Sequence, residues 1–354
     1  MKILLVGEFS GFHNNLKEGL VALGHDCVVA GKPDGSKKIQ IDINLDSEFQ
    51  GLKGKIFRVI KSILFALRVR HYDVVQFVNP IVFPRGFGLN KILIKTIVRK
   101  CKKSFLSSCG DDAFFVELGA KKMRYSPLPE ALKYDLKKVK HPAGGIQNFE
   151  WNRELASMVN GVIPAMYEYT LGYQGVGNLR ECIPLPINCA KIKYEENCPK
   201  DKIVIFHGLN RYGFKGTRHV EKAFEYLNEK YPEDLQCIIA GGMSLSSYLD
   251  VMRNANVVVD QTSSYSCGMN ALYAMAMGKV VLGGAEPESL ASYGIPSSPV
   301  INIKPSSDDI ISCVERLLHE RSQISEIGRQ SRRFVEDFHD YRLVAKKYLS
   351  QWLH

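Results

Sequence analysis

Two cationic residues and three glycines lie close together in the segment HGLNRYGFKGT, residues 207–217. Arg211 and Lys215 lie on either side of one glycine, and Gly216 follows at the start of a predicted helix. Guanidinium and ammonium groups bind phosphate oxygens through charge-assisted hydrogen bonds. The segment is therefore predicted to bind a diphosphate, and the alternative is a solvated basic loop.

A second anion site is predicted within VVVDQTSSYSCGMNALYAMAMGKVVLGG, residues 257–284. Its β-branched start predicts a buried strand, a polar loop follows, and good helix formers run from Cys267 to Met277. Ser264 or Ser266 is expected to cap this helix, and Gly268 leaves its first turn open. Free N–H groups and the helix dipole favour an anion there. The alternative is a core βαβ unit without a ligand.

Polar residues also follow two predicted strands of the first half. Gly11 and His13 lie in a loop after the first strand, and Asp111 and Asp112 follow the strand at 104–108. Ligands of parallel α/β sheets collect at the carboxyl ends of strands, so these residues are candidates for a site. For His13 the alternative is an ordinary exposed histidine. The GxGxxG fingerprint of nicotinamide cofactors is absent.

Buried strands alternate with helices along the whole chain, which predicts parallel sheets covered on both faces. The two predicted strand runs are 2–7, 27–30, 73–77, 104–108 and 162–163, then 202–206, 235–240, 257–259, 280–282 and 300–301. The stiff stretch IPLPIN, residues 183–188, separates them. We predict two Rossmann-like domains that face each other across a cleft. They cover residues 1–183 and 184–336. The last helix is predicted over residues 331–352, and the part at about 337–354 is expected to pack back on the first domain.

Composition agrees with a soluble two-domain protein without a metal site. A chain of 354 residues exceeds what one hydrophobic core usually serves. Its nine cysteines form no CxxC pair, so reduced thiols in a cytoplasm are expected rather than disulfides or zinc. Glu8 comes too early for the apolar core of a signal peptide, and no apolar run reaches membrane-spanning length.

Positive charge is concentrated in the first half. Residues 1–183 contain 27 lysines and arginines against 17 acids, whereas residues 184–354 contain 20 of each. Within the first half, Gly51 to His71 is a basic amphipathic segment, with apolar residues at helical spacing: Ile56, Val59, Ile60, Ile63, Leu64 and Leu67. It is predicted to be either a surface helix packed on its own core or a helix on anionic lipid headgroups.

The second half resembles the C-terminal domain of GT-B glycosyltransferases, in particular glycosyltransferase family 4. Arg211, Lys215 and Gly216 are similar to the family's Arg…Lys-Gly loop. Gly268 and YAMAMGKVV, residues 273–281, are similar to its "EAMA-G-PVV" helix. IPLPIN resembles the interdomain linker, and SSCGDD, residues 107–112, loosely resembles an N-domain "HGSD" loop. The resemblance covers residues 183–288 above all.

The resemblance implies a nucleotide-diphospho-sugar donor on the C-terminal domain and an acceptor on the N-terminal domain. Arg211, Lys215, Gly216 and the amides of Gly268, Met269 and Asn270 would bind the leaving diphosphate. Aligning the motif places Tyr265 and Tyr273 where the family has two glutamates, so both tyrosines are predicted to contact the donor. Glu286 is expected to contact the donor sugar or to be a helix N-terminal charge. Asp111, Asp112 and Tyr265 are the catalytic candidates, and Gly11 and His13 are expected on the acceptor side.

The resulting hypothesis is a metal-independent, retaining sugar transferase of the hexosyltransferase type, without a cofactor. It would act on a glycan or lipid-linked acceptor in cell-surface polysaccharide synthesis, in the cytoplasm and peripherally at an anionic membrane, and no nucleic-acid partner is expected. No Asp-x-Asp motif occurs. A GT-B nucleotide-sugar epimerase and a non-catalytic nucleotide-sugar or polyanion binder are the alternatives. The nucleotide, the sugar and the acceptor stay open.

Overall fold

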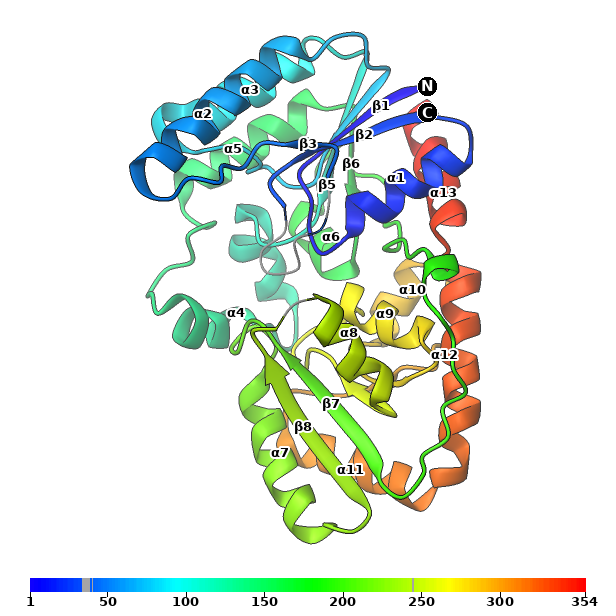
Figure 1. Cartoon of the computed structure of the whole chain (residues 1–354). Helices are drawn as coiled ribbons and strands as arrows, with labels where there is room; N and C mark the ends of the chain where they lie inside the picture. Colours follow the sequence, from blue (N-terminus) through cyan, green and yellow to red (C-terminus); the bar gives the residue numbers. More distant parts are fainter. Residues whose placement is uncertain (34–38, 40, 244) are drawn as a thin grey trace. The chain divides into compact units, whose positions relative to one another are not determined.

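A computed structural model describes residues 1–33, 39, 41–243 and 245–354 (Figure 1). Its contacts divide the chain into two compact units. The first unit contains residues 1–119, 143–186 and 341–354, and the second contains residues 120–142 and 187–340. Both are α/β units with a parallel sheet, as the alternation of strands and helices predicts.

The first unit has a six-stranded parallel sheet in the order β3-β2-β1-β4-β5-β6. Strand β1 lies near the middle, where Ile3 pairs with Cys27 on one side and Val74 on the other. The predicted hydrophobic runs form these strands, and the short β3 is an addition. The strands are β1 (Lys2–Val6), β2 (Asp26–Gly31), β3 (Ile43–Asn44), β4 (Val74–Phe77), β5 (Lys103–Ser108) and β6 (Gly161–Pro164).

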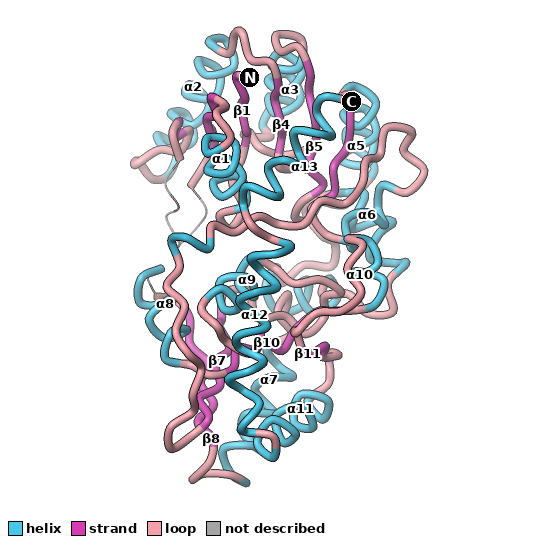
Figure 2. The backbone as a smooth tube through the Cα atoms, turned by 90° about the vertical axis from the view of Figure 1, so that its right-hand side faces the viewer, coloured by secondary structure: helices cyan, strands magenta, loops and turns pink. Residues whose placement is uncertain are grey.

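Helices cover both faces of this sheet. Residues of α2 (Gly51–Arg68), α3 (Leu89–Val98) and α5 (Ile146–Met158) share one apolar core with β1, β4 and β5. On the opposite face, α1 (Phe12–Ala22) packs beside α13 (Tyr341–Leu353), as Figures 1 and 2 show. Helix α6 (Tyr167–Tyr173) follows β6.

Two interactions fix α13 on the first unit. The indole Nε1 of Trp352 donates to Gln76 Oε1 of β4 at 3.1 Å. Gly19 of α1 lies so close to the backbone of Tyr341 that an added Cβ would be 2.1 Å from its carbonyl oxygen.

The helix predicted as continuous over residues 331–352 is two helices, α12 (Ile324–Phe338) and α13. The break coincides with a parallel bridge at Asp340, where the carbonyl of His339 accepts from the N–H of Ile187 at 2.8 Å.

The second unit has a five-stranded parallel sheet in the order β11-β10-β9-β7-β8. Helices α7 and α11 pack on one apolar core with the central strands, and α9 lies beside α12 (Figure 2). The strands are β7 (Ile203–Leu209), β8 (Leu235–Gly241), β9 (Val257–Val259), β10 (Val280–Gly283) and β11 (Ile301–Asn302). In addition to α12, this unit contains the helices α4 (Leu128–Glu130), α7 (Thr217–Lys230), α8 (Leu245–Asn254), α9 (Met269–Ala276), α10 (Pro287–Ser292) and α11 (Ser307–His319).

Residues 120–142 pack with the second unit, although the sequence-based division includes them in the first domain. The carboxylate of Asp135 accepts from the backbone N–H groups of Gly213 and Phe214 at 2.9 and 2.8 Å. Glu130 forms an ion pair with Arg218 at 2.5 Å. These partners are far apart in sequence, so no local pattern indicates them. This segment, residues 120–142, is called the inserted segment below.

Candidate functional site

The loop between β7 and α7 brings Lys215 against the end of β9. The Lys215 side chain is 8% exposed, and its Nζ lies 3.3 Å from Oδ1 of Asp260, which is 3% exposed. Gly216 has φ +66°, and a Cβ there would be 2.0 Å from Oγ1 of Thr262, so the turn requires glycine. The predicted cation is therefore buried in an ion pair, not exposed on a flexible loop.

Arg211 lies in the same loop, with its guanidinium 3.8 Å from the centre of the Phe214 ring. Stacking uses the face of the guanidinium and leaves its planar N–H geometry suited to phosphate oxygens. The N–H groups of Gly213 and Phe214 are bound by Asp135 of the inserted segment. The inserted segment therefore fixes the loop that presents Arg211.

Helix α9 begins at Met269, and its N-cap residue, Gly268, provides no side-chain cap. Ser264 and Ser266, the predicted caps, bond elsewhere: Ser264 Oγ donates to the carbonyl of Ser266 at 3.0 Å, and Ser266 Oγ pairs with Ser289 Oγ at 2.7 Å. A Cβ at Gly268 would meet Asp260 Oδ2 at 3.7 Å as its nearest neighbour, so the turn is open. The start of α9 is thus suited to an anion.

Asp260 connects the loop and the helix. Its Oδ1 accepts from Asn270 Nδ2 at 3.1 Å as well as from Lys215. Asn270 Oδ1 accepts in turn from the hydroxyl of Tyr248 on α8. Met269 is buried, so only its backbone can face a ligand. Lys215 and Asn270, in the first turn of α9, therefore both bind this carboxylate, which brings the predicted cation next to the predicted helix start.

Tyr265 contacts the inserted segment. It is 2% exposed. Its hydroxyl accepts from the backbone N–H of Arg124 at 2.7 Å, and the Arg124 guanidinium lies 4.8 Å from its ring centre. Tyr273 is half-buried on α9. The two tyrosines at the glutamate positions therefore differ in burial.

Glu286 is buried at the start of α10, where its side chain does not cap the helix. Its Oε1 accepts from the hydroxyl of Tyr125 and from Asn302 Nδ2, the latter at 2.8 Å. Its Oε2 forms an ion pair with Arg124, which also binds Glu288. Burial opposes ionisation, but these hydrogen bonds and the arginine hold the pKa of Glu286 below its usual value. The Glu286 carboxylate therefore holds the inserted segment against the start of α10 through Tyr125 and Arg124.

The acceptor-side candidates of the first unit are enclosed. His13 is fully buried, with Nδ1 2.7 Å from the carbonyl of Gly7 and Nε2 3.3 Å from Gln76 Nε2. The backbone N–H of Gly11 donates to Oε1 of Glu8 at 2.7 Å, and that of Asn14 to Oε2 at 2.8 Å. The protein's own carboxylate therefore occupies the anion-binding end of α1, and His13 supports the fold.

Asp112 is also fully buried, and both of its oxygens bind the chain. Oδ1 accepts from the N–H of Phe115 at 2.8 Å, and Oδ2 accepts from the hydroxyl of Tyr173 at 2.8 Å. Burial raises its pKa to about 6. Asp111 is only partly buried. Of the two predicted catalytic carboxylates, Asp111 is therefore the less buried one, and Asp112 organises the turn behind it.

Two buried histidines predict that the folded protein loses stability as the pH falls. Burial lowers the pKa of His13 and of His207 to about 4. Between pH 6.5 and 4 the unfolded chain binds protons that the folded chain does not, so these groups lower stability as the pH falls through this window. At pH 5 each should remove about 2 kcal/mol from the free energy of unfolding. Asp112, whose pKa is raised, acts in the opposite direction.

Urea unfolding of the wild type and of His207→Asn at pH 7 and pH 5 measures this effect. Asparagine can still donate to the carbonyl of Val259, which lies 2.9 Å from His207 Nδ1. The difference in unfolding free energy between the two pH values should be about 2 kcal/mol smaller in the variant. Equal differences in both proteins would show that His207 does not stay neutral in the fold.

The sequence pattern did not indicate several residues of this site. Asp260 directly follows the buried strand β9, a position that could have marked it, whereas Arg124 and Tyr125 carry no local signal. Within the described ranges, no group of three or more His, Cys, Asp or Glu side chains is arranged to bind a metal ion.

The fold is shared with solved glycosyltransferase structures. Sucrose-phosphate synthase from Thermosynechococcus elongatus superposes with a TM-score of 0.64 at 15% identity, covering 99% of this chain and 98% of that one. Anabaena HepE, in complex with UDP and glucose, gives 0.61 at 11%, with coverages of 99% and 98%. A glycosyltransferase from Rickettsia africae gives 0.58 at 12%, with 99% and 97%. No protein-family model and no curated protein sequence matches this chain. The chain therefore has the GT-B fold.

Proposed function

We propose that this protein is a glycosyltransferase that moves a hexosyl group from a nucleotide-diphospho-sugar to a glycan or lipid-linked acceptor in cell-surface polysaccharide synthesis. The observation that carries the proposal is that Lys215 and Asn270, in the first turn of α9, both bind Asp260, so that the predicted cation lies next to the uncapped start of the helix. A cation and open helix amides at one point of a GT-B second unit suit a diphosphate. HepE, with the same fold, is described with UDP and glucose.

In the proposed reaction, negative charge grows on the leaving diphosphate. Arg211, Lys215 and the amides of Gly268, Met269 and Asn270 would stabilise it in the transition state without a metal ion. Tyr273 would contact the ribose, and Tyr265 would support the donor site through Arg124. Asp111 is the less buried of the two candidate carboxylates on the acceptor side. Transfer is proposed to retain the anomeric configuration.

Turnover with and without an acceptor tests the proposal. A thermal-shift panel of nucleotide-sugars first selects the donor, because binding to the folded state raises the melting temperature. A transferase should consume that donor in proportion to an added acceptor, and a product of opposite anomeric configuration would contradict retention. Conversion to an isomeric nucleotide-sugar without acceptor would indicate an epimerase instead, and binding without any turnover would indicate a binder.

We further propose that the first unit docks on an anionic membrane through α2. The apolar residues of this helix face outward instead of packing on the core: Leu52 is 73%, Ile60 47% and Leu67 55% exposed. The side that is buried contains Gly54, Ser62, Phe65 and Ala66. Between Gly51 and Gly110 there are 13 lysines and arginines and one acid, Asp73. Outward apolar residues among cations suit lipid headgroups.

No helix of the described chain is long and apolar enough to cross a bilayer. The proposed contact is therefore peripheral, at the inner face of the membrane, with α2 lying in the headgroup layer. Arg58 and Lys61 are poor choices for testing it, because both bind Asp46. Their replacement would loosen the loop before α2 as well as reduce the charge.

Replacing Ile60 and Leu67 together with aspartate should reduce binding to anionic liposomes at least tenfold. Each side chain would otherwise bury apolar area in the bilayer, worth about 1.5–3 kcal/mol. Co-sedimentation with vesicles of rising anionic lipid content, at low and high salt, measures the effect. Val139→Asp, at a 94% exposed position of the second unit, is the control. Liposome binding that does not depend on anionic lipid content, or an equal loss of binding in Val139→Asp, would count against docking through α2.

A further inference from the structure

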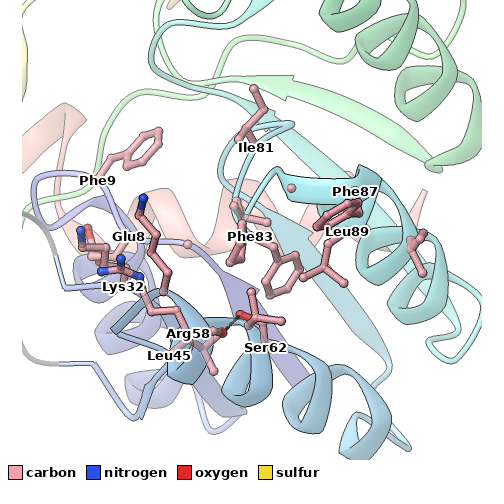
Figure 3. Close-up of a pocket in the computed structure, with 17 residues that line it drawn as sticks. Glu8, Phe9, Lys32, Leu45, Arg58, Ser62, Ile81, Phe83, Phe87 and Leu89 are labelled. Atoms are coloured by element: carbon pink, nitrogen blue, oxygen red, sulfur yellow. Dashed lines mark hydrogen bonds between the residues drawn. The ribbon is translucent and has the colours of Figure 1, made fainter. Parts of the chain in front are cut away.

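The first unit contains a pocket of about 930 Å³ beside α2 (Figure 3). One wall is the side of α2 with Lys55, Arg58, Val59 and Ser62, and the opposite wall is the segment Ile81–Ile92. The floor is the end of β1 with Gly7 and Glu8. The pocket therefore lies at the carboxyl end of a central strand, where α/β folds bind ligands.

The pocket has a charged side and an apolar side. Figure 3 shows Lys32 and Arg58 near Glu8, with Phe83, Phe87 and Leu89 on the other side. Arg58 and Lys32 lie 3.3 and 3.8 Å from the carboxylate of Asp46, so that acid partly neutralises them. Lys55 is exposed and has no ion-pair partner among the described residues. Its ammonium is thus available to an anionic ligand.

Phe87 extends the apolar side to the protein surface. It is fully exposed and has φ +52°, a left-handed conformation that is unfavourable for a bulky side chain, between Gly86 and Gly88. A strained and exposed aromatic residue at the lip of a pocket indicates a ligand contact. The outward apolar residues of α2 belong to the same helix that forms the opposite wall. A molecule in the pocket would therefore meet apolar side chains along one side, from Phe83 out to Phe87 at the surface.

We propose that this pocket binds the apolar chain of a phosphate-bearing lipid acceptor, with the phosphate at Lys55. The inference rests on the proposed function and selects the lipid-linked class among its acceptors. A glycan chain would need many hydrogen-bonding side chains, whereas the walls are mainly Val, Ile, Leu and Phe. A pocket volume of about 930 Å³ is large enough to enclose a long hydrocarbon chain. The cations at one side match an anionic head.

Equilibrium binding of farnesyl phosphate, farnesol and inorganic phosphate to the full-length protein tests the proposal. Farnesyl phosphate should bind at least tenfold more tightly than farnesol, and inorganic phosphate should neither bind measurably nor compete. Lys55→Ala should reduce the preference for the phosphate ester at least fivefold, because it removes the cation that would bind the phosphate. The fold does not use this ammonium, so the variant should fold normally. Equal affinities for farnesyl phosphate and farnesol in the wild type would overturn the assignment of the head group.

Adjacent residues of α2 give a matched pair of variants. Val59 lines the pocket, whereas Ile60 faces outward. Val59→Trp should therefore weaken farnesyl phosphate binding at least tenfold, and Ile60→Trp should leave it unchanged. Val82→Trp fills the pocket from the opposite wall and serves as a second blocking variant if Val59→Trp does not fold. Blocking variants that bind as tightly as Ile60→Trp would overturn the proposal.

Nucleotide-sugar binding separates this inference from the function on which it rests. The same variants should keep the thermal shift given by the selected nucleotide-sugar, because they lie in the first unit. A protein that binds the donor but not farnesyl phosphate would refute the lipid pocket and leave the transferase proposal intact. A protein that binds farnesyl phosphate but no nucleotide-sugar would refute the transferase proposal instead.

Discussion

Lys215→Met is expected to lower the free energy of unfolding by about 3 kcal/mol and to reduce donor turnover at least tenfold. The substitution removes the charge partner of Asp260, a carboxylate that is 3% exposed. Asn270 alone would then remain to hydrogen-bond its Oδ1. Urea unfolding and turnover of the selected nucleotide-sugar measure the two effects. The sequence alone predicts little change in stability, because it places Lys215 at an exposed surface.

A second substitution separates stability from function. In Lys215→Met/Asp260→Asn the buried charge is gone, and asparagine can still accept from Asn270. The double variant should regain most of the lost stability and little of the turnover, because the ammonium that would bind the diphosphate is still missing. Recovery of both properties would show that Lys215 serves the fold alone. Arg211→Ala, which breaks no buried pair, should reduce turnover without a comparable loss of stability.

The strands and their order of appearance could be predicted because their signal is local. The β-branched runs at Val257–Val259 and Val280–Leu282 become adjacent buried strands β9 and β10. A strand buried on both faces needs an apolar side chain at every position, and that requirement is visible in a few residues. The helix between them begins after Gly268 for a similarly local reason, namely the polar loop before it.

Helix α2 shows where periodicity stops being informative. Apolar spacing correctly indicates that Ile56, Ile60, Ile63 and Leu67 share one face of a helix. It does not determine whether that face meets the core or the surroundings. The structure turns it outward and buries the side with Gly54, Ser62, Phe65 and Ala66, which is less apolar than the exposed side. Only the excess of cations in the sequence suggested the alternative that the exposure supports.

The candidate site could be predicted only in part, for the same reason. Lys215 and Gly268 were found because each belongs to a short motif at a helix start. Arg124 pairs with Glu286 across 162 residues, and no periodicity or spacing encodes such a distance. His13 was selected by type and place, yet its two ring nitrogens are used inside the fold. Residue type predicts chemistry, whereas burial decides whether a ligand can reach it.

The inserted segment depends on Glu286, so replacing this residue should release it. Glu286→Ala leaves the donors of Tyr125 and Asn302 without their acceptor and removes one partner of Arg124. We expect a loss of about 2 kcal/mol in unfolding free energy from the two donors left without an acceptor, and little from the ion pair, because Arg124 is 54% exposed. Hydrogen exchange in residues 120–142 should rise more than exchange in β7 or β10. Lys17→Ala, which removes an ion pair with Asp42 in the first unit, is the control.

The conservative variant Glu286→Gln distinguishes this role from the predicted contact with the donor sugar. Glutamine still accepts from Tyr125 and Asn302 through its amide oxygen, but its amide nitrogen replaces the oxygen that accepts from Arg124, so the contact with Arg124 is lost. If Glu286 fastens the inserted segment, Glu286→Gln should lose less than half the stability that Glu286→Ala loses and keep most of its turnover. If the carboxylate instead binds sugar hydroxyls, turnover should fall at least tenfold in both variants, while exchange in the inserted segment stays low in Glu286→Gln. The contacts to Tyr125, Asn302 and Arg124 favour the first outcome, because they already occupy both carboxylate oxygens.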